Sequence, residues 1–203
     1  MEPFPATFEV DYAGGERNRW LGAAGIITYI KQLLLIPHFI VLFFLGIGTF
    51  FGAWIGYFMI LFTGQRQPEG LHKFISGTIG WSNRTSVWQY SLVDEYPPFE
   101  LHPVNPYPAV WSDTDDTPGR NRLLALAGIF GIKFLMVLPH IIILALVGFG
   151  AFVAAWVGYW IILFTGNLPE GIHTFVTGFQ RWAARVGAWL LSLTDTYPPF
   201  SLD

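Results

Sequence analysis

Two long stretches without a charged side chain constrain this chain more than any other feature of its sequence. Residues 33–62 and 134–164 contain no Lys, Arg, Asp or Glu. Each run exceeds the ~20 apolar residues that a helix needs to cross a bilayer, whereas a buried helix of a soluble protein rarely stays uncharged for so long. The chain is 53% hydrophobic and only 12% charged, about half the charge of an ordinary soluble domain. We therefore expect an integral membrane protein.

Both runs belong to a tandem repeat. Uncommon residues recur at a displacement of 102 up to Gly64 and of 101 from Pro68 onward, too many in register to reflect shared hydrophobicity alone. The recurring residues of the first copy include Lys31, Pro37, His38, Trp54, Tyr57, Gly64, Glu69, His72, Trp81, Arg84, Trp88, Asp94 and Tyr96. We divide the chain into a polar N-terminal segment (1–16), repeat 1 (17–101), a Pro- and Asp-rich linker (102–119) and repeat 2 (120–203).

The motifs of the repeat resemble those of a known family. "ILFTG", "PEG", "RW…RV" and a closing "DTYPPF" are similar to motifs of small bacterial, often actinobacterial, integral membrane proteins that are catalogued only as a domain of unknown function. The resemblance extends over nearly the whole chain and is strongest between residues 161 and 202. It implies a helical membrane fold in the bacterial inner membrane, and it implies no activity.

The basic residues indicate how each repeat meets the membrane. Nine of the eleven flank the apolar runs: Arg17, Arg19, Arg66, Lys73, Arg84, Arg120, Arg122, Arg181 and Arg185. If each repeat is a helical hairpin that crosses the bilayer twice, all nine lie on one side, whereas single crossings divide them almost evenly. The positive-inside rule favours the hairpins. We therefore predict a multi-pass protein with both termini and the 64–120 connector in the cytoplasm.

The tip of each hairpin is less strongly signalled. Paired glycines at Gly46 and Gly48, and at Gly148 and Gly150, have the spacing of a turn. The alternative break is at Pro37 and Pro139, because proline removes a backbone donor and clashes with the preceding turn. Shallow hairpins that never reach the far side of the membrane also fit the sequence.

After each run, "TG" and then "PEG" predict a corner followed by a second helix. Glycine ends a helix in the left-handed conformation, and proline with glutamate suits the first turn of the next. In repeat 2, apolar residues from Ile172 to Leu193 recur at helical spacing with arginines on other faces, which is typical of a helix in the membrane interface. The residues expected to contact lipid there are Arg66, His72, Arg84, His173, Arg181, Trp182, Arg185 and Trp189. The closing "YPPF" stops this helix, and residues 6–12, 100–104 and 201–203 are candidates for short cytoplasmic strands.

The fold class is therefore all-α: two tandem repeats, each a membrane-embedded helical hairpin followed by an amphipathic interfacial helix. Candidate chemistry is sparse. The chain has no cysteine, and its net charge of −3 excludes nucleic acid as an expected partner. We find no metal-protease, phosphate-loop or nucleophile motif.

Two histidines stand out because they lie at equivalent positions inside the uncharged runs. His38 and His140 could ligate a haem iron or a chlorophyll, since ionisable residues inside a membrane are often functional. More simply, each could hydrogen-bond a carbonyl freed by the neighbouring proline. Lys31 and Lys133, about two helical turns earlier, are expected to extend their side chains to the interface.

Two classes of function follow. We expect a non-enzymatic structural or accessory protein, without cofactor, that packs against membrane lipid and against another membrane protein or a second copy of itself. The alternative is a cofactor-binding or transport component in which His38 and His140 act.

Overall fold

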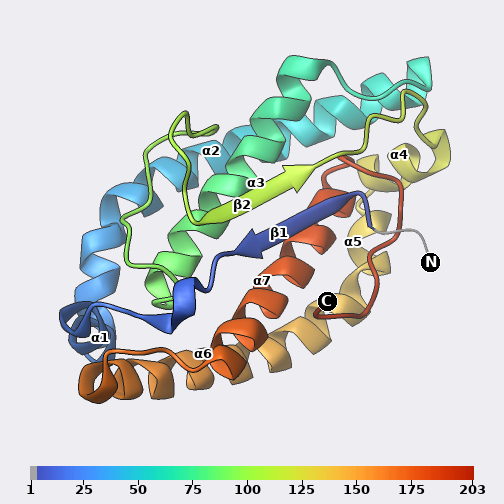
Figure 1. Cartoon of the computed structure of the whole chain (residues 1–203). Coiled ribbons are helices and arrows are strands. Elements are labelled where there is room, and N and C mark those ends of the chain that lie inside the picture. Colours follow the sequence, from blue (N-terminus) through green and yellow to red (C-terminus); the bar gives the residue numbers. More distant parts are fainter. Residues whose placement is uncertain (1–3) are drawn as a thin grey trace.

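The structure is a computed structural model that describes residues 4–203, with the backbone alone at residues 28 and 29. Helices dominate it, as expected, and two short strands accompany them (Figure 1). In chain order the elements are β1 (Ala6–Val10), the 3-10 turn η1 (Ala13–Gly15), α1 (Arg19–Ile26), α2 (Thr28–Thr63), α3 (Glu69–Gln89), β2 (Ala109–Asp113), α4 (Arg122–Ile129), α5 (Ile132–Met136), α6 (Leu138–Thr165) and α7 (Glu170–Leu190).

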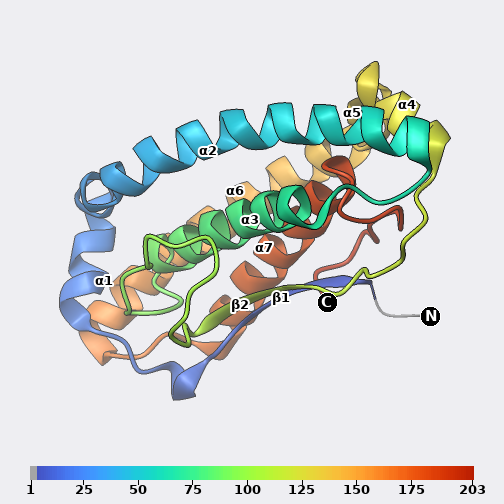
Figure 2. The same cartoon turned by 90° about the horizontal axis from the view of Figure 1, so that it is seen from above.

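The elements form three layers. The long helices α2 and α6 make the first, and α3 and α7 pack against them as the second. The third is the strand pair, in which β2 lies on α3 and β1 lies on α7. Figure 2 shows α2 on one side of α3 and the strands on the other. The strands are antiparallel, with Ala6 opposite Asp113 and Val10 opposite Ala109.

The long helices do not turn at the glycines. Gly46 and Gly48 lie inside the 36 residues of α2, and Gly148 lies inside the 28 residues of α6, so hairpin tips at these positions are wrong. The glycines make room for aromatic rings instead. A Cβ at Gly48 would lie 3.1 Å from the Phe74 ring, and one at Gly148 would lie 3.0 Å from the Phe179 ring. Small residues in apolar helices commonly serve such close packing.

The prolines mark the breaks only in repeat 2. Pro37 lies inside α2 without ending it, whereas Pro139 is in the first turn of α6, a position that proline favours. The chain bends at Ile27, between α1 and α2, and at Gly131 and Val137, on either side of α5.

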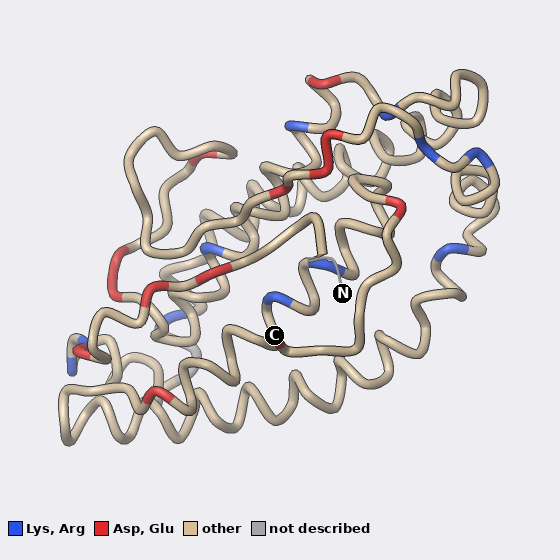
Figure 3. Tube along the Cα trace, turned by 45° about the vertical axis from the view of Figure 1, so that its right-hand side comes forward, with Lys and Arg blue, Asp and Glu red and all other residues tan. Residues whose placement is uncertain are grey.

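The outer faces of α2 and α6 are apolar and exposed. The exposed fraction is 64% for Phe43, 66% for Phe44, 70% for Phe149 and 72% for Phe164. Ile30–Thr63 and Leu138–Thr165 are long and apolar enough to cross a membrane. Figure 3 shows the charged residues on the strands, loops and shorter helices, whereas the traces of α2 and α6 are almost free of charge. Each of these two helices therefore presents a large apolar surface.

The second layer is buried, contrary to the expectation of interfacial helices. Trp182 and Trp189 of α7 are 4% and 1% exposed, and most of α3 is equally covered. The stripe that the sequence suggested would face lipid instead faces α6 and the closing segment of its own repeat. Helix α7 is amphipathic, as predicted, but protein covers its apolar side.

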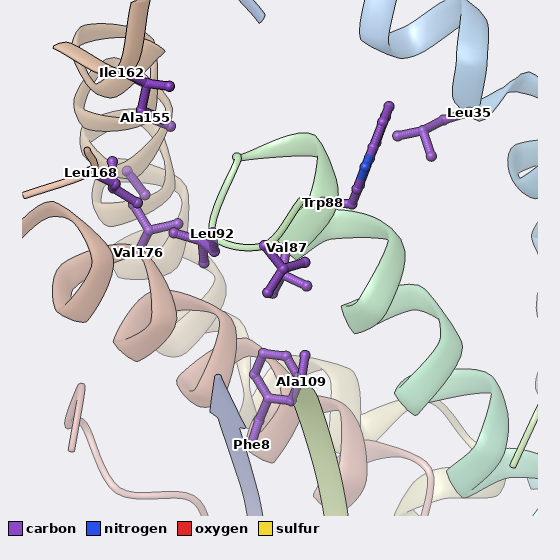
Figure 4. Close-up of a cluster of buried hydrophobic side chains, with 12 residues drawn as sticks. Phe8, Leu35, Val87, Trp88, Leu92, Ala109, Ala155, Ile162, Leu168 and Val176 are labelled. Atoms are coloured by element: carbon purple, nitrogen blue, oxygen red, sulfur yellow. The ribbon is translucent and has the colours of Figure 1, made fainter. Parts of the chain in front are cut away.

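The two repeats interlock. Helix α1 of repeat 1 packs on α6, and α4 of repeat 2 packs on α2. The main core is likewise shared: Figure 4 shows Phe8 of β1 and Ala109 of β2 near Val87 of α3, and Val176 of α7 beside Leu92 of repeat 1. Neither repeat therefore encloses a core by itself.

The recurring corner joins the repeats. Gly64 and Gly166 adopt the left-handed conformation after α2 and α6, with φ of 71° and 82°, which confirms the predicted helix ends. The carbonyl of Gly166 accepts a 2.8 Å hydrogen bond from the backbone N–H of Arg17, and that of Gly64 accepts a 2.9 Å bond from Arg120. Each corner is thus tied to the start of the other repeat, which explains why the phrase is needed twice.

The strands were partly foreseen. β1 falls within residues 6–12, as predicted, but its partner lies in the linker rather than in residues 100–104 or 201–203, where the structure has no strand. The linker is therefore part of the fold, because β2 covers α3.

Two buried lysines close the ends of α3 and α7. Lys31 Nζ donates to the carbonyl of Trp88 (2.8 Å) and to Ser91 Oγ (2.5 Å), and Lys133 makes the equivalent bonds in repeat 2. Both lysines are 1% exposed, so the expectation that they reach the interface is wrong. A cation at a helix C-terminus complements the helix dipole and satisfies its free carbonyls.

We expect Lys133→Met to lower the free energy of unfolding by roughly 1.5–3 kcal/mol, because it leaves a buried carbonyl and a hydroxyl without their charged donor. The measurement is thermal unfolding in detergent followed by circular dichroism. Lys73→Met is the matched control, since Lys73 forms an exposed pair with Glu69 on α3, and exposed ion pairs contribute little to stability. Equal losses in the two variants would contradict the capping role.

Candidate functional site

The predicted histidine of repeat 1 lies in an aromatic cluster. His38 is fully buried, and its Nδ1 accepts a 2.9 Å hydrogen bond from the indole of Trp81 on α3. Its ring stacks on Phe99, with centroids 3.8 Å apart, and the tilted ring of Tyr96 lies 5.0 Å away. The cluster therefore joins "PH", the helix tryptophan and "YPPF" into one unit.

Repeat 2 builds the same cluster. His140 Nδ1 accepts from Trp182 at 3.0 Å, and the ring stacks on Phe200 at 3.7 Å, beside Tyr197. Each tyrosine hydroxyl reaches back to the long helix: Tyr197 donates to the carbonyl of Met136 at 2.8 Å. In repeat 1 the acceptor is the carbonyl of Leu34, three residues before proline. Each tyrosine thus bonds the carbonyl next to the one that the proline frees, which lies four residues before the proline. The histidines bond neither carbonyl, so the simpler expectation for them is wrong.

The clusters define what a cofactor would meet. Because Nδ1 accepts from an indole, the neutral imidazole carries its proton on Nε2. That Nε2 is buried in both clusters and has no hydrogen-bond partner among residues 4–203. A metal would bind at this nitrogen only after it lost its proton. The geometry favours a packing role, in which the histidine fixes the closing segment against the helices.

The other predicted contacts are turned toward protein. Arg84 donates to the carbonyls of Glu100 and Leu101, and Arg185 donates to the carbonyl of Asp203. These arginines hold the segments that follow "YPPF" against α3 and α7. Burial lowers the pKa of Arg84 to about 10, which leaves its guanidinium charged at neutral pH.

Arg181 and Trp189 have similar roles. Arg181 Nε donates to the carbonyl of Phe8 in β1 at 2.8 Å, so it ties the strand to α7. The indole of Trp189 donates to the carbonyl of Asp195 at 3.2 Å. Neither side chain forms a lipid-facing surface in this structure.

A polar pocket lies between α3, β2 and residues 101–103, with a volume of about 410 Å³. The side chains of His72 and Asp113 meet across it at 2.8 Å, and those of Arg66 and Asp116 meet at 3.3 Å. The histidine and the arginine were predicted as contact residues, whereas the two carboxylates have no local sequence signal. They belong to the linker, and only the pairing of β2 brings them to α3. Because Arg66 and His72 each lie against a carboxylate, the pocket is a polar site in which the side chains bond one another.

His173 occupies the equivalent place in repeat 2 but has different neighbours. It lies beside the ring of Tyr12, with centroids 5.1 Å apart, and is 4% exposed. Burial, together with the nearby Arg17 guanidinium, lowers the pKa of His173 to about 4.

This pKa predicts a loss of stability in mild acid. The unfolded chain binds a proton at His173 with a pKa near 6.5, whereas the folded chain binds it with a pKa of about 4. The free energy of unfolding therefore decreases as the pH falls between these values. At pH 5 the loss from this residue is about 2 kcal/mol relative to pH 7.5. We expect His173→Gln to remove that part of the pH dependence when melting in detergent is compared at both pH values. An unchanged pH dependence would refute this.

Comparison with known proteins agrees with the internal repeat. The family model described as a domain of unknown function, DUF4389, matches residues 27–100 and again residues 129–201. The first match begins directly after α1 and the second at the last residue of α4, and both end just after the "YPPF" segments. Each match therefore includes one aromatic histidine cluster. No curated protein and no solved structure matches the chain. With both copies together accounting for well over half of its length, the chain belongs to the DUF4389 family and carries the domain twice in tandem.

Proposed function

We propose that the protein is a non-enzymatic accessory protein of the bacterial inner membrane, which holds its apolar layer in lipid and packs there against another membrane protein or a second copy. The observation that carries the proposal is the exposed aromatic face of α2 and α6. An exposed apolar surface of this extent is typical of a membrane or protein interface. Each fully buried phenylalanine on it would contribute on the order of 1.5–3 kcal/mol to membrane association.

The position of α3 beside α2 favours an arrangement in which α2 and α6 lie parallel to the membrane plane, within one leaflet. If α2 stood along the bilayer normal, α3 beside it would stand there too. Arg84 lies about 22 Å along α3 from Glu69 at the helical rise of 1.5 Å per residue. The polar pocket between these residues would then sit in hydrocarbon, where charged groups are costly. With α2 and α6 parallel to the membrane plane, the pocket and the strands face water.

This arrangement corresponds to the shallow hairpins that do not reach the far side of the membrane. We propose it in place of helices that cross the bilayer fully. It keeps the nine flanking basic residues, both termini and the linker on one side, as the positive-inside rule requires. That side is the cytoplasm in our proposal.

Single-cysteine labelling tests the orientation, since the chain has no native cysteine. We expect Ser112→Cys and Ser201→Cys to react with a membrane-impermeant maleimide in inverted vesicles but not in intact cells. Ile47→Cys, on the apolar face of α2, should react in neither. Reaction of Ile47→Cys in intact cells would establish that α2 reaches the outer surface. Recovery of the chain in the soluble fraction after lysis would refute membrane residence altogether.

The alternative function is cofactor binding, and the unpartnered Nε2 of each histidine is the observation that favours it. An absorbance spectrum of the purified protein separates the two. We expect no Soret or chlorophyll band. A band that disappears in His38→Ala with His140→Ala would establish the alternative.

A further inference from the structure

A second cavity lies where α3 and α7 cross. It has a volume of about 320 Å³, and we call it the crossing groove. Thr49 of α2, Ser82, Asn83 and Ser86 of α3, and Gln180 of α7 line it. Gly46 of α2 lies at its edge, where a Cβ would meet no atom within 4 Å.

The groove opens away from the strands. Ser82 and Arg84 are two positions apart on α3, so they point in directions about 200° apart around the helix. Arg84 faces the pocket beside β2. Ser82, which is exposed, therefore faces the side on which α2 and α6 present their apolar surfaces. In the membrane arrangement proposed above, on which this inference rests, that side meets lipid.

The lining of the groove is polar but uncharged. None of its residues is Lys, Arg, Asp, Glu or His. Thr49 is 6% exposed and Asn83 is 8% exposed, yet Thr49 Oγ1 and Asn83 Nδ2 have no hydrogen-bond partner within the described chain. A buried donor or acceptor without a partner is destabilising. A ligand in the groove that formed hydrogen bonds with these two side chains would remove that cost.

The internal repeat supplies an apolar counterpart to this lining. The residues that correspond to Thr49, Ser82, Asn83 and Ser86 in repeat 2 are Ala151, Ala183, Ala184 and Gly187. Because α3 and α7 cross each other, the last three of these line the same groove from the opposite wall. Helix α7 thus forms with small apolar residues at positions where α3 carries hydroxyl and amide groups.

We propose that the crossing groove binds the head of an uncharged, lipid-soluble molecule that both donates and accepts hydrogen bonds, such as the hydroxyl and ester carbonyl of a neutral glycerolipid. The absence of charged lining residues disfavours a phosphate or an ammonium head, which would enter without a counter-ion. The volume is at the lower end of ligand sites and suits a head of a few polar atoms. The apolar tail would lie along exposed residues of α2 next to Gly46, such as Ile47 and Phe50.

Equilibrium binding of radiolabelled dioctanoylglycerol to the purified full chain in detergent tests the proposal. We expect saturable binding of one molecule per chain. Thr49→Ala combined with Asn83→Ala should weaken it at least about tenfold, because both hydrogen bonds to the ligand are lost. This double variant copies the residues of repeat 2, so it should fold, and its melting temperature checks that.

Thr177→Ala is the matched control. Its hydroxyl is also buried and unpartnered within residues 4–203, but it does not line the groove, so its removal should leave binding unchanged. Dioctanoyl phosphatidic acid, which has the same tails and a charged head, should compete poorly. Tighter binding of the phosphatidic acid, equal binding by the double variant, or no saturable binding would overturn the proposal. Since the assay is made in detergent, a negative result leaves the proposed membrane location, which labelling tests, intact.

Discussion

The buried amino groups of Lys31 and Lys133 fix the geometry on which the other contacts depend. The side chain of Lys31 extends from the start of α2 to a carbonyl at the end of α3. The side chain of Lys133 extends from α5 to a carbonyl at the end of α7. Tyr159 adds a hydroxyl from the other repeat to the end of α3, and Tyr57 does the same for α7. One node per repeat thus holds three helices together, and it sets which face of each long helix turns inward. The remaining faces are left to the surroundings.

The recurring motifs acquire a common explanation from this geometry. Histidine, tryptophan and "YPPF" close the side of each repeat, while the glycine corner connects to the start of the other repeat. The arginines that follow hold the closing segments. Most of the uncommon residues in the repeat therefore serve the architecture, which is consistent with a chain that has no evident catalytic centre among its described residues.

Sequence alone was sufficient for the features that depend on local chemistry. The apolar runs, the repeat, the left-handed glycines and the start of α3 and α7 at Pro-Glu all follow from neighbouring residues. The prediction of a hairpin tip was wrong because two local sequences look alike. A glycine pair inside an apolar run can turn the chain, or it can make room for a ring such as that of Phe74. The prediction that two tryptophans of α7 contact lipid was wrong for a related reason. Trp182 and Trp189 form an apolar stripe, and a stripe does not reveal whether lipid or protein covers it. The β1–β2 pairing joins residues about a hundred positions apart, so no local signal predicts its register or the meeting of His72 with Asp113.

The interlocking of the repeats has a consequence for the history of the chain. A protein with one repeat would have no α6 for its α1, no second strand, and no partner for its glycine corner. Two such chains would supply all three to each other around a two-fold axis. The tandem chain is thus equivalent to a homodimer whose subunits a gene duplication has fused. In a true homodimer every substitution appears twice, whereas fusion allows the halves to evolve separately. That freedom is what permits an asparagine at position 83 while its counterpart at 184 is an alanine.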